Sequence, residues 1–145
     1  MQGYIYLQTH PDYPDQVLLR TQDTEPTPND QPPTTLHYIA HFTNAHIAYM
    51  HVHDTLKRHM VSLNDRRYRC SLPHAIAAIE AKDLKQQRCW IAPELAADDD
   101  AQQQIAAQIH QLQQRQQRIH RRYLMAGGVG IILLMFILLG GVWRV

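Results

Sequence analysis

QGYIYLQT, at residues 2–9, is the stretch that decides the fold. Its aromatic and β-branched residues favour a β-strand, with Tyr4 and Tyr6 on one face and the aliphatic residues between and after them on the other. The prolines and aspartates of residues 10–15 are typical of a turn. QVLLRT, at residues 16–21, then predicts a second strand, so we expect the two strands to pair as an antiparallel hairpin.

A third strand is expected after a long loop. Residues 22–34 hold four prolines, which remove backbone donors and fix φ, so this segment is expected to be extended rather than helical. Residues 35–42 place Leu, Tyr, Ala and Phe at every second position, which is the periodicity of a strand. The first part of the chain therefore predicts a three-stranded antiparallel sheet.

Two helices are expected next. Asn44 is a good N-cap for a helix over residues 45–61, and Ser71 is a good N-cap for a helix over residues 71–87. Two short extended segments complete the pattern, namely Arg67–Cys70 and residues 89–91. We thus expect a small α+β domain over residues 1–92.

A helical stalk is expected over residues 93–123, which are rich in glutamine and alanine. Its apolar side chains follow the spacing of four and three residues that is typical of a coiled coil: Ile105, Ile109, Leu112, Ile119 and Tyr123. The seam covers only about three heptads. Two interpretations therefore stay open, namely a homodimer through a coiled coil and a single helix that packs on its own domain.

The last apolar stretch is LMAGGVGIILLMFILLGGVW, at residues 124–143, which carries no charge. A helix of about 20 apolar residues spans the hydrocarbon core of a bilayer, so this stretch predicts one transmembrane helix. Four arginines precede it, namely Arg115, Arg118, Arg121 and Arg122. Because positively charged flanks stay in the cytoplasm, we expect a single-pass membrane protein with a C-terminal anchor and a cytoplasmic N-terminal domain.

Charge and composition exclude several functions. The formal net charge is +1, but the first hundred residues hold thirteen acidic and nine basic side chains and carry a net charge of −4. The domain as a whole is therefore not a basic nucleic-acid binder. Glycine occurs only at position 3 and in residues 124–143, which excludes a glycine-rich phosphate loop. The two cysteines, in a domain expected to be cytoplasmic, predict reduced thiols.

Three short motifs resemble the GIY-YIG superfamily, in its phage-derived DNA-binding, nuclease-like branch. GYIYL at Gly3–Leu7 is similar to the opening of that domain, VHDTL at Val52–Leu56 to its L-H-x-x-L motif, and SLPHAIAAI at Ser71–Ile79 to its closing helix. The resemblance covers about residues 2–85. It implies a small GIY-YIG-like domain whose three-stranded antiparallel sheet is flanked by helices.

The resemblance also implies a catalytic set, because GIY-YIG nucleases use tyrosines, an arginine and a metal-binding glutamate. A rearranged site in this chain would have to use Tyr4, Tyr6, Arg20 and His53. The glutamate position, four residues before His53, is Tyr49, and a phenol does not replace a carboxylate as a magnesium ligand. We therefore expect that metal-dependent cleavage is lost and that no cofactor is bound, with magnesium required only if the chain is an active nuclease. His53 is then expected to form a hydrogen bond at the edge of the core.

Five basic residues cluster within thirteen positions: Lys57, Arg58, Arg66, Arg67 and Arg69. They could contact phosphate groups of DNA or anionic lipid, or they could form a solvated helix end and turn. The histidines of residues 37–59 lack the spacing of a defined metal site, so no metal is expected.

Three functions stay open at this point. The first is a membrane-anchored, catalytically degenerate GIY-YIG-like domain that acts as a binding module and contacts DNA. The second is an active GIY-YIG-type DNA endonuclease with a rearranged site. The third is a structural membrane protein that dimerises through its stalk and anchor and binds a protein partner.

Overall fold

The computed structural model describes the backbone of residues 2–27, 33–82 and 84–142. From residue 120 onward it describes the side chains of Tyr123 and Met135 only. The chain forms two compact units, Met1–His110 and Gln111–Val145.

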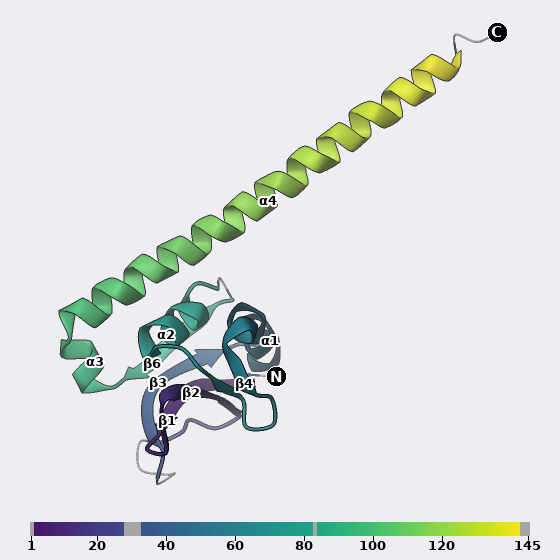
Figure 1. Ribbon diagram of the computed structural model, residues 1–145. Coiled ribbons are helices and arrows are strands. Elements are labelled where there is room, and N and C mark those ends of the chain that lie inside the picture. The colour runs from purple at the N-terminus through teal and green to yellow at the C-terminus, as the bar shows by residue number, and fades with distance from the viewer. Residues whose placement is uncertain (1, 28–32, 83, 143–145) are drawn as a thin grey trace. The chain divides into compact units, whose positions relative to one another are not determined.

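The first unit contains a six-stranded sheet in which every strand pair is antiparallel (Figure 1). The strands are β1 (Gly3–His10), β2 (Tyr13–Gln22), β3 (Thr35–Phe42), β4 (Met60–Ser62), β5 (Arg67–Tyr68) and β6 (Gln86–Ile91). Their order in the sheet is β4-β5-β2-β1-β3-β6. The stretch that opens the chain thus forms an inner strand, and its predicted hairpin with β2 is confirmed.

The expectation of a three-stranded sheet is wrong, because three short strands extend the sheet at both edges. On one side β5 pairs with β2 and β4 pairs with β5, while on the other side β6 pairs with β3. β4 and β5 are only three and two residues long. The extended segments expected at Arg67–Cys70 and 89–91 correspond to β5 and to the end of β6, whereas β4 was not expected.

The helices of the fold are α1 (Ala45–Leu56), the 3₁₀ turn η1 (Lys57–His59), α2 (Leu72–Glu80), α3 (Pro93–Ala97) and α4 (Asp99–Val142). Both predicted N-caps are confirmed, because the Asn44 side chain accepts from the Ile47 amide and the Ser71 side chain accepts from the His74 amide. Both helices end earlier than expected. After α1 the chain enters β4, and after α2 it returns to the sheet as β6.

The main core lies between one face of the sheet and the helices α1 and α2, which cover that face (Figure 1). Strand β1 contributes Ile5 and Leu7, and α1 contributes Val52 and Leu56. Ile105, in the first part of α4, is also buried in this core. The compact unit therefore extends to His110, beyond the expected domain end at residue 92.

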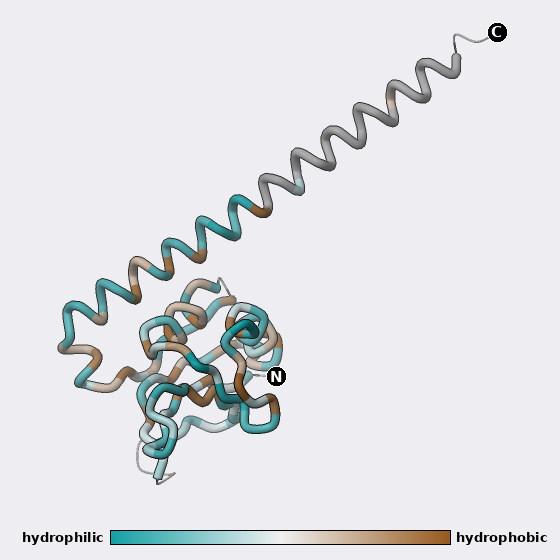
Figure 2. The backbone as a smooth tube through the Cα atoms, in the orientation of Figure 1, coloured by the Kyte–Doolittle hydropathy of each residue, from teal (hydrophilic) through white to brown (hydrophobic). Residues whose placement is uncertain are grey.

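The predicted transmembrane helix, and with it the single-pass membrane localisation, is not supported by the structure. Among the residues that the structure describes, no helix has a stretch long and apolar enough to cross a membrane. Figure 2 shows that the described residues of α4 are mostly hydrophilic. The expected anchor at residues 124–143 lies largely outside the described side chains.

Candidate functional site

The four candidate catalytic residues do not meet. Tyr6 and Arg20 face each other across the β1–β2 ladder, and Tyr4 lies on the same side of the sheet. The alternate residues of β1 point into the core beneath α1, so the helix that carries His53 covers the opposite face. The sheet therefore separates His53 from the two tyrosines and Arg20. Tyr6 is itself buried, and its hydroxyl lies 3.5 Å from the Gln22 side-chain oxygen.

His53 instead belongs to an aromatic cluster at the edge of the core. Its Nδ1 atom lies 2.7 Å from the Tyr68 hydroxyl, so the expected hydrogen bond is confirmed. The Tyr49 ring stacks on the His53 ring at a centroid distance of 6.1 Å. The Arg66 guanidinium lies 4.6 Å from the centroid of Tyr49, and its Nη1 atom donates to the Thr21 hydroxyl at 3.2 Å. This cluster ties α1 to β5 and to the turn before it.

The role of the aromatic cluster is to stabilise the fold. Tyr68 is 1% exposed, which leaves no path for a substrate to its hydroxyl. Burial and a hydrogen bond with Tyr49 raise the pKa of Tyr68, so the phenol stays protonated at neutral pH. No group of three or more histidine, cysteine, aspartate or glutamate side chains in the described part of the chain could hold a metal ion.

Four of the five basic residues have a partner of their own in the described part of the chain. Lys57 pairs with Asp54 at 2.7 Å, and Arg67 pairs with Asp65 at 2.8 Å. Two further contacts are the ion pair of Arg69 with Asp15 and the stacking of Arg66 on Tyr49. Arg58 is the member for which the described residues provide neither an ion pair nor a hydrogen bond. Since carboxylates already neutralise three of these cations, the expectation of a phosphate-binding patch gains no support.

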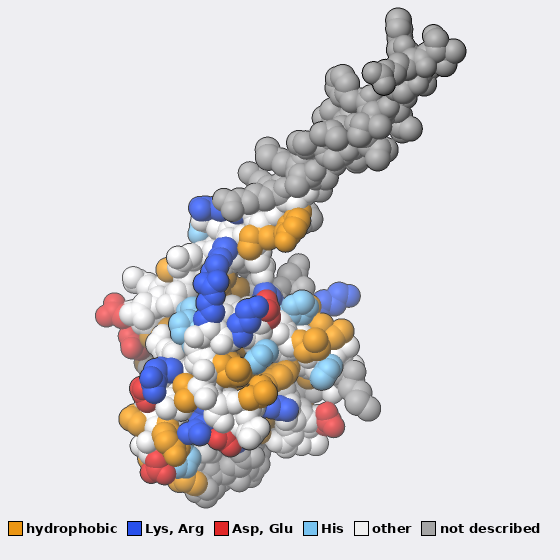
Figure 3. Space-filling view, turned by 45° about the vertical axis from the view of Figure 1, so that its right-hand side comes forward, with side chains coloured by type: hydrophobic (Ala, Val, Ile, Leu, Met, Phe, Trp, Pro, Cys, Tyr) orange, Lys and Arg blue, Asp and Glu red, His pale blue; other side chains and the backbone are white. Residues whose placement is uncertain are grey.

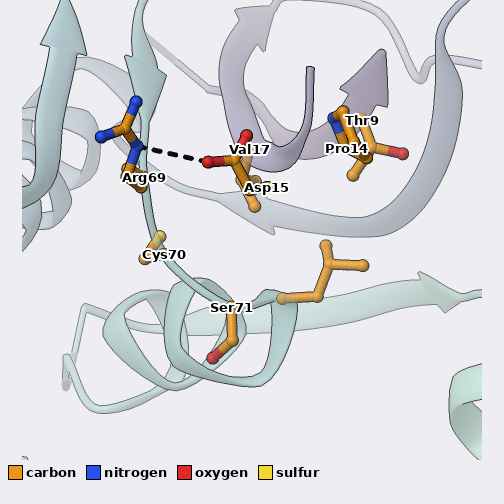
Figure 4. A pocket seen from close by; sticks show the side chains of 8 residues that line it. Thr9, Pro14, Asp15, Val17, Arg69, Cys70 and Ser71 are labelled. Atoms are coloured by element: carbon orange, nitrogen blue, oxygen red, sulfur yellow. Dashed lines mark ion pairs between the residues drawn. The ribbon is translucent and has the colours of Figure 1, made fainter. Parts of the chain in front are cut away.

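A cavity of about 400 Å³ lies at the start of α2, below the β1–β2 hairpin (Figure 4). Among its lining residues, Arg69 and Asp15 form an ion pair with each other, and the Ser71 hydroxyl accepts a hydrogen bond from the His74 amide. Burial raises the pKa of the Cys70 thiol to about 11, so the thiol stays protonated and unreactive. The polar groups of this cavity are thus occupied within the protein.

The outer side of α1 and the neighbouring β4 carry an exposed apolar surface. We call it the α1–β4 surface, and it consists of Ile47, Met50, Met60, Val61 and Leu63. The two elements are adjacent because η1 joins them and because Met60 faces Tyr68, whose hydroxyl contacts His53 of α1. Figure 3 shows hydrophobic and histidine side chains gathered on this side of the molecule.

Sequence reasoning missed this surface because it expected one long helix over residues 45–61, which would have included Met60. In the structure the helix ends at Leu56, and Met60 is 40% exposed in an edge strand. A signal was nevertheless present. Ile47 and Met50 lie outside the apolar stripe of α1 that faces the core, and the run MVSL at residues 60–63 is rich in apolar residues.

The comparisons with known proteins add no relative. No protein-family profile, curated protein or solved structure matches the chain. The expectation of a DNA-binding GIY-YIG domain is therefore unsupported by any comparison.

Proposed function

We propose that the unit Met1–His110 is a non-catalytic binding domain that recognises another protein through the α1–β4 surface. One observation carries this proposal. Among the described residues of this unit, six large hydrophobic side chains are exposed, and five of them belong to the α1–β4 surface. Apolar side chains gathered on one part of a protein surface commonly mark an interaction site.

The make-up of the surface supports binding. Leu63 is 64% exposed and Met50 is 57% exposed, so both would lose much contact with water under a partner. Methionine side chains adapt to irregular partners because they are unbranched and polarisable. The aromatic cluster beneath the surface holds α1 against β5 and gives the exposed residues a fixed support.

A test of the non-catalytic part uses the full chain with magnesium or manganese. We expect no heat of metal binding in calorimetry and no cleavage of linear or branched DNA, because the candidate residues lie on opposite sides of the sheet. Cleavage that requires the metal and disappears in Tyr6→Phe would overturn the proposal and identify a nuclease.

A test of the binding part uses a photo-crosslinking residue in place of Met50. The matched control carries the same residue in place of Tyr13, which is the sixth exposed hydrophobic side chain of the unit and lies outside the surface. We expect a protein from a cell extract to be captured at position 50 and not at position 13. Equal capture at both positions would contradict a specific surface.

A further inference from the structure

We infer that the partner segment on the α1–β4 surface is an amphipathic helix with an acidic polar face. This inference rests on the proposed function and specifies its partner. It comes from the charges that surround the apolar side chains and from the shape of the two elements that present them.

Basic and imidazole side chains lie on the same elements as the surface and on the turn after β4: His46 and His51 in α1, Lys57, Arg58 and His59 in η1, and Arg66 just before β5. Two carboxylates on these segments are already engaged, because Asp54 pairs with Lys57 and Asp65 pairs with Arg67. Within the described part of the chain, Arg58 and Arg66 have no carboxylate partner. The positive charge of these two arginines is opposite in sign to the net charge of the first hundred residues, which is −4. Complementary charges of a partner would therefore be carboxylates.

The shape of the surface favours a helix over an added strand. β4 is an edge strand, but it has three residues and an irregular register with β5, so it offers a poor template for strand addition. Ile47 and Met50 are three residues apart on α1 and form part of a ridge on its outer side. A ridge of this kind packs into the groove between side chains of another helix.

Nucleic acid fits the surface less well. Protein–DNA contacts are dominated by polar groups that reach phosphates, whereas five apolar side chains occupy the centre here. Arg58 lies in η1, which joins α1 to β4, and the Arg66 guanidinium stacks on Tyr49 of α1. A helix with apolar and acidic faces would satisfy the apolar side chains and these arginines together.

Two designed peptides of about 18 residues, or five helical turns, provide the test. Both carry leucine on one face, and the other face carries glutamate in one peptide and lysine in its matched control. We expect the full chain to bind the glutamate peptide at least about tenfold more tightly in fluorescence anisotropy. We also expect Met50→Asp and Arg58→Glu each to weaken that binding, while Tyr13→Ser leaves it unchanged.

Three outcomes would overturn the inference. They are equal binding of the two peptides, binding of neither peptide, and displacement of the glutamate peptide by duplex DNA of equal charge. Circular dichroism of each variant shows that a loss of binding is not a loss of fold. The crosslinking test of the proposed function does not depend on the charge of the partner. Its result therefore distinguishes failure of the proposed function from failure of this inference.

Discussion

Tyr68 and His53 meet at 2.7 Å at the edge of the core, and this contact explains why His53 is better described as a structural than as a catalytic residue. The phenol is buried and protonated, and the imidazole is held between the rings of Tyr49 and Tyr68. The sequence placed His53 at the core edge correctly. It did not show the partner, because Tyr68 lies in a two-residue strand whose position depends on pairing with β2.

The first prediction concerns this hydrogen bond. Tyr68→Phe removes the hydroxyl and should lower the free energy of unfolding by about 1 kcal/mol, since water can reach the half-buried His53 and partly replace the lost bond. Urea denaturation measures the change. Tyr13→Phe, at an exposed ring, is the matched control and should change stability far less. Equal effects of the two substitutions would contradict a structural role for the bond.

The second prediction concerns pH. Burial, and then the neighbouring His59, lower the pKa of His74 below its usual 6.5. The unfolded chain then binds a proton at this residue more readily than the folded chain does. The contribution of His74 to the free energy of unfolding should therefore be fully present above pH 6.5. It should be lost as the pH drops from 6.5 through the lowered pKa.

Urea denaturation of the wild type and of His74→Gln between neutral pH and pH 5 checks this prediction. The variant should lose less stability on acidification than the wild type does. An identical loss in both proteins would show that His74 does not contribute. His37, whose pKa is also lowered by burial, should account for part of the slope that remains in the variant.

At the scale of elements, the sequence predicts those that rest on local patterns, predicts β5 and part of β6 as extended segments without their pairing, and misses β4. The alternation in β1 and β3 and the caps at Asn44 and Ser71 are local, and each is confirmed. β4 and β6 acquire their backbone partners only in the folded sheet. The turn before β6 holds Lys85 at φ 51°, a conformation that a lysine does not signal in sequence.

A polar network joins three of these elements. Glu80 of α2 accepts from the Tyr38 hydroxyl of β3 at 2.9 Å and from Arg88 Nε of β6 at 2.6 Å. The Tyr38 ring is almost fully buried, and burial together with the Glu80 carboxylate raises the pKa of Tyr38. The carboxylate thus fixes α2 to one edge of the sheet.

The third prediction follows from this network. Glu80→Ala leaves the Tyr38 hydroxyl and Arg88 without their acceptor, so we expect the free energy of unfolding to fall by about 1–3 kcal/mol. Lys57→Ala removes an exposed ion pair and serves as the control, for which little change is expected. If urea denaturation shows that the Glu80→Ala variant is as stable as the control variant, the polar network does not stabilise the fold.

At the scale of the whole molecule, the sequence placed the domain end at residue 92, where a proline follows and the composition changes. The structure extends the compact unit to His110, because the first part of α4 packs Ala101 and Ile105 into the core. The apolar residues of α4 keep the same spacing in the part that packs into the core and in the part that is exposed to solvent. Sequence alone therefore could not separate packing on the domain from pairing between stalks.

The fourth prediction tests this extension. Ile105 is 2% exposed, so Ile105→Ala should create a cavity and lower the free energy of unfolding by about 2–4 kcal/mol. Ile119 shares the same spacing but is 45% exposed, and Ile119→Ala should cost far less. Similar costs for the two substitutions in urea denaturation would mean that the core ends before α4.

Crosslinking across the α1–β4 surface tests the central claim most directly. A photo-crosslinking residue is placed in the full chain at Ile47, Met50, Val61 or Leu63, and at Tyr13 and Gln87 as exposed controls outside the surface. The proposed function predicts that the four surface positions capture the same protein and that the two controls do not. Capture spread evenly over all six positions, or different proteins at each surface position, would contradict a single protein-binding surface.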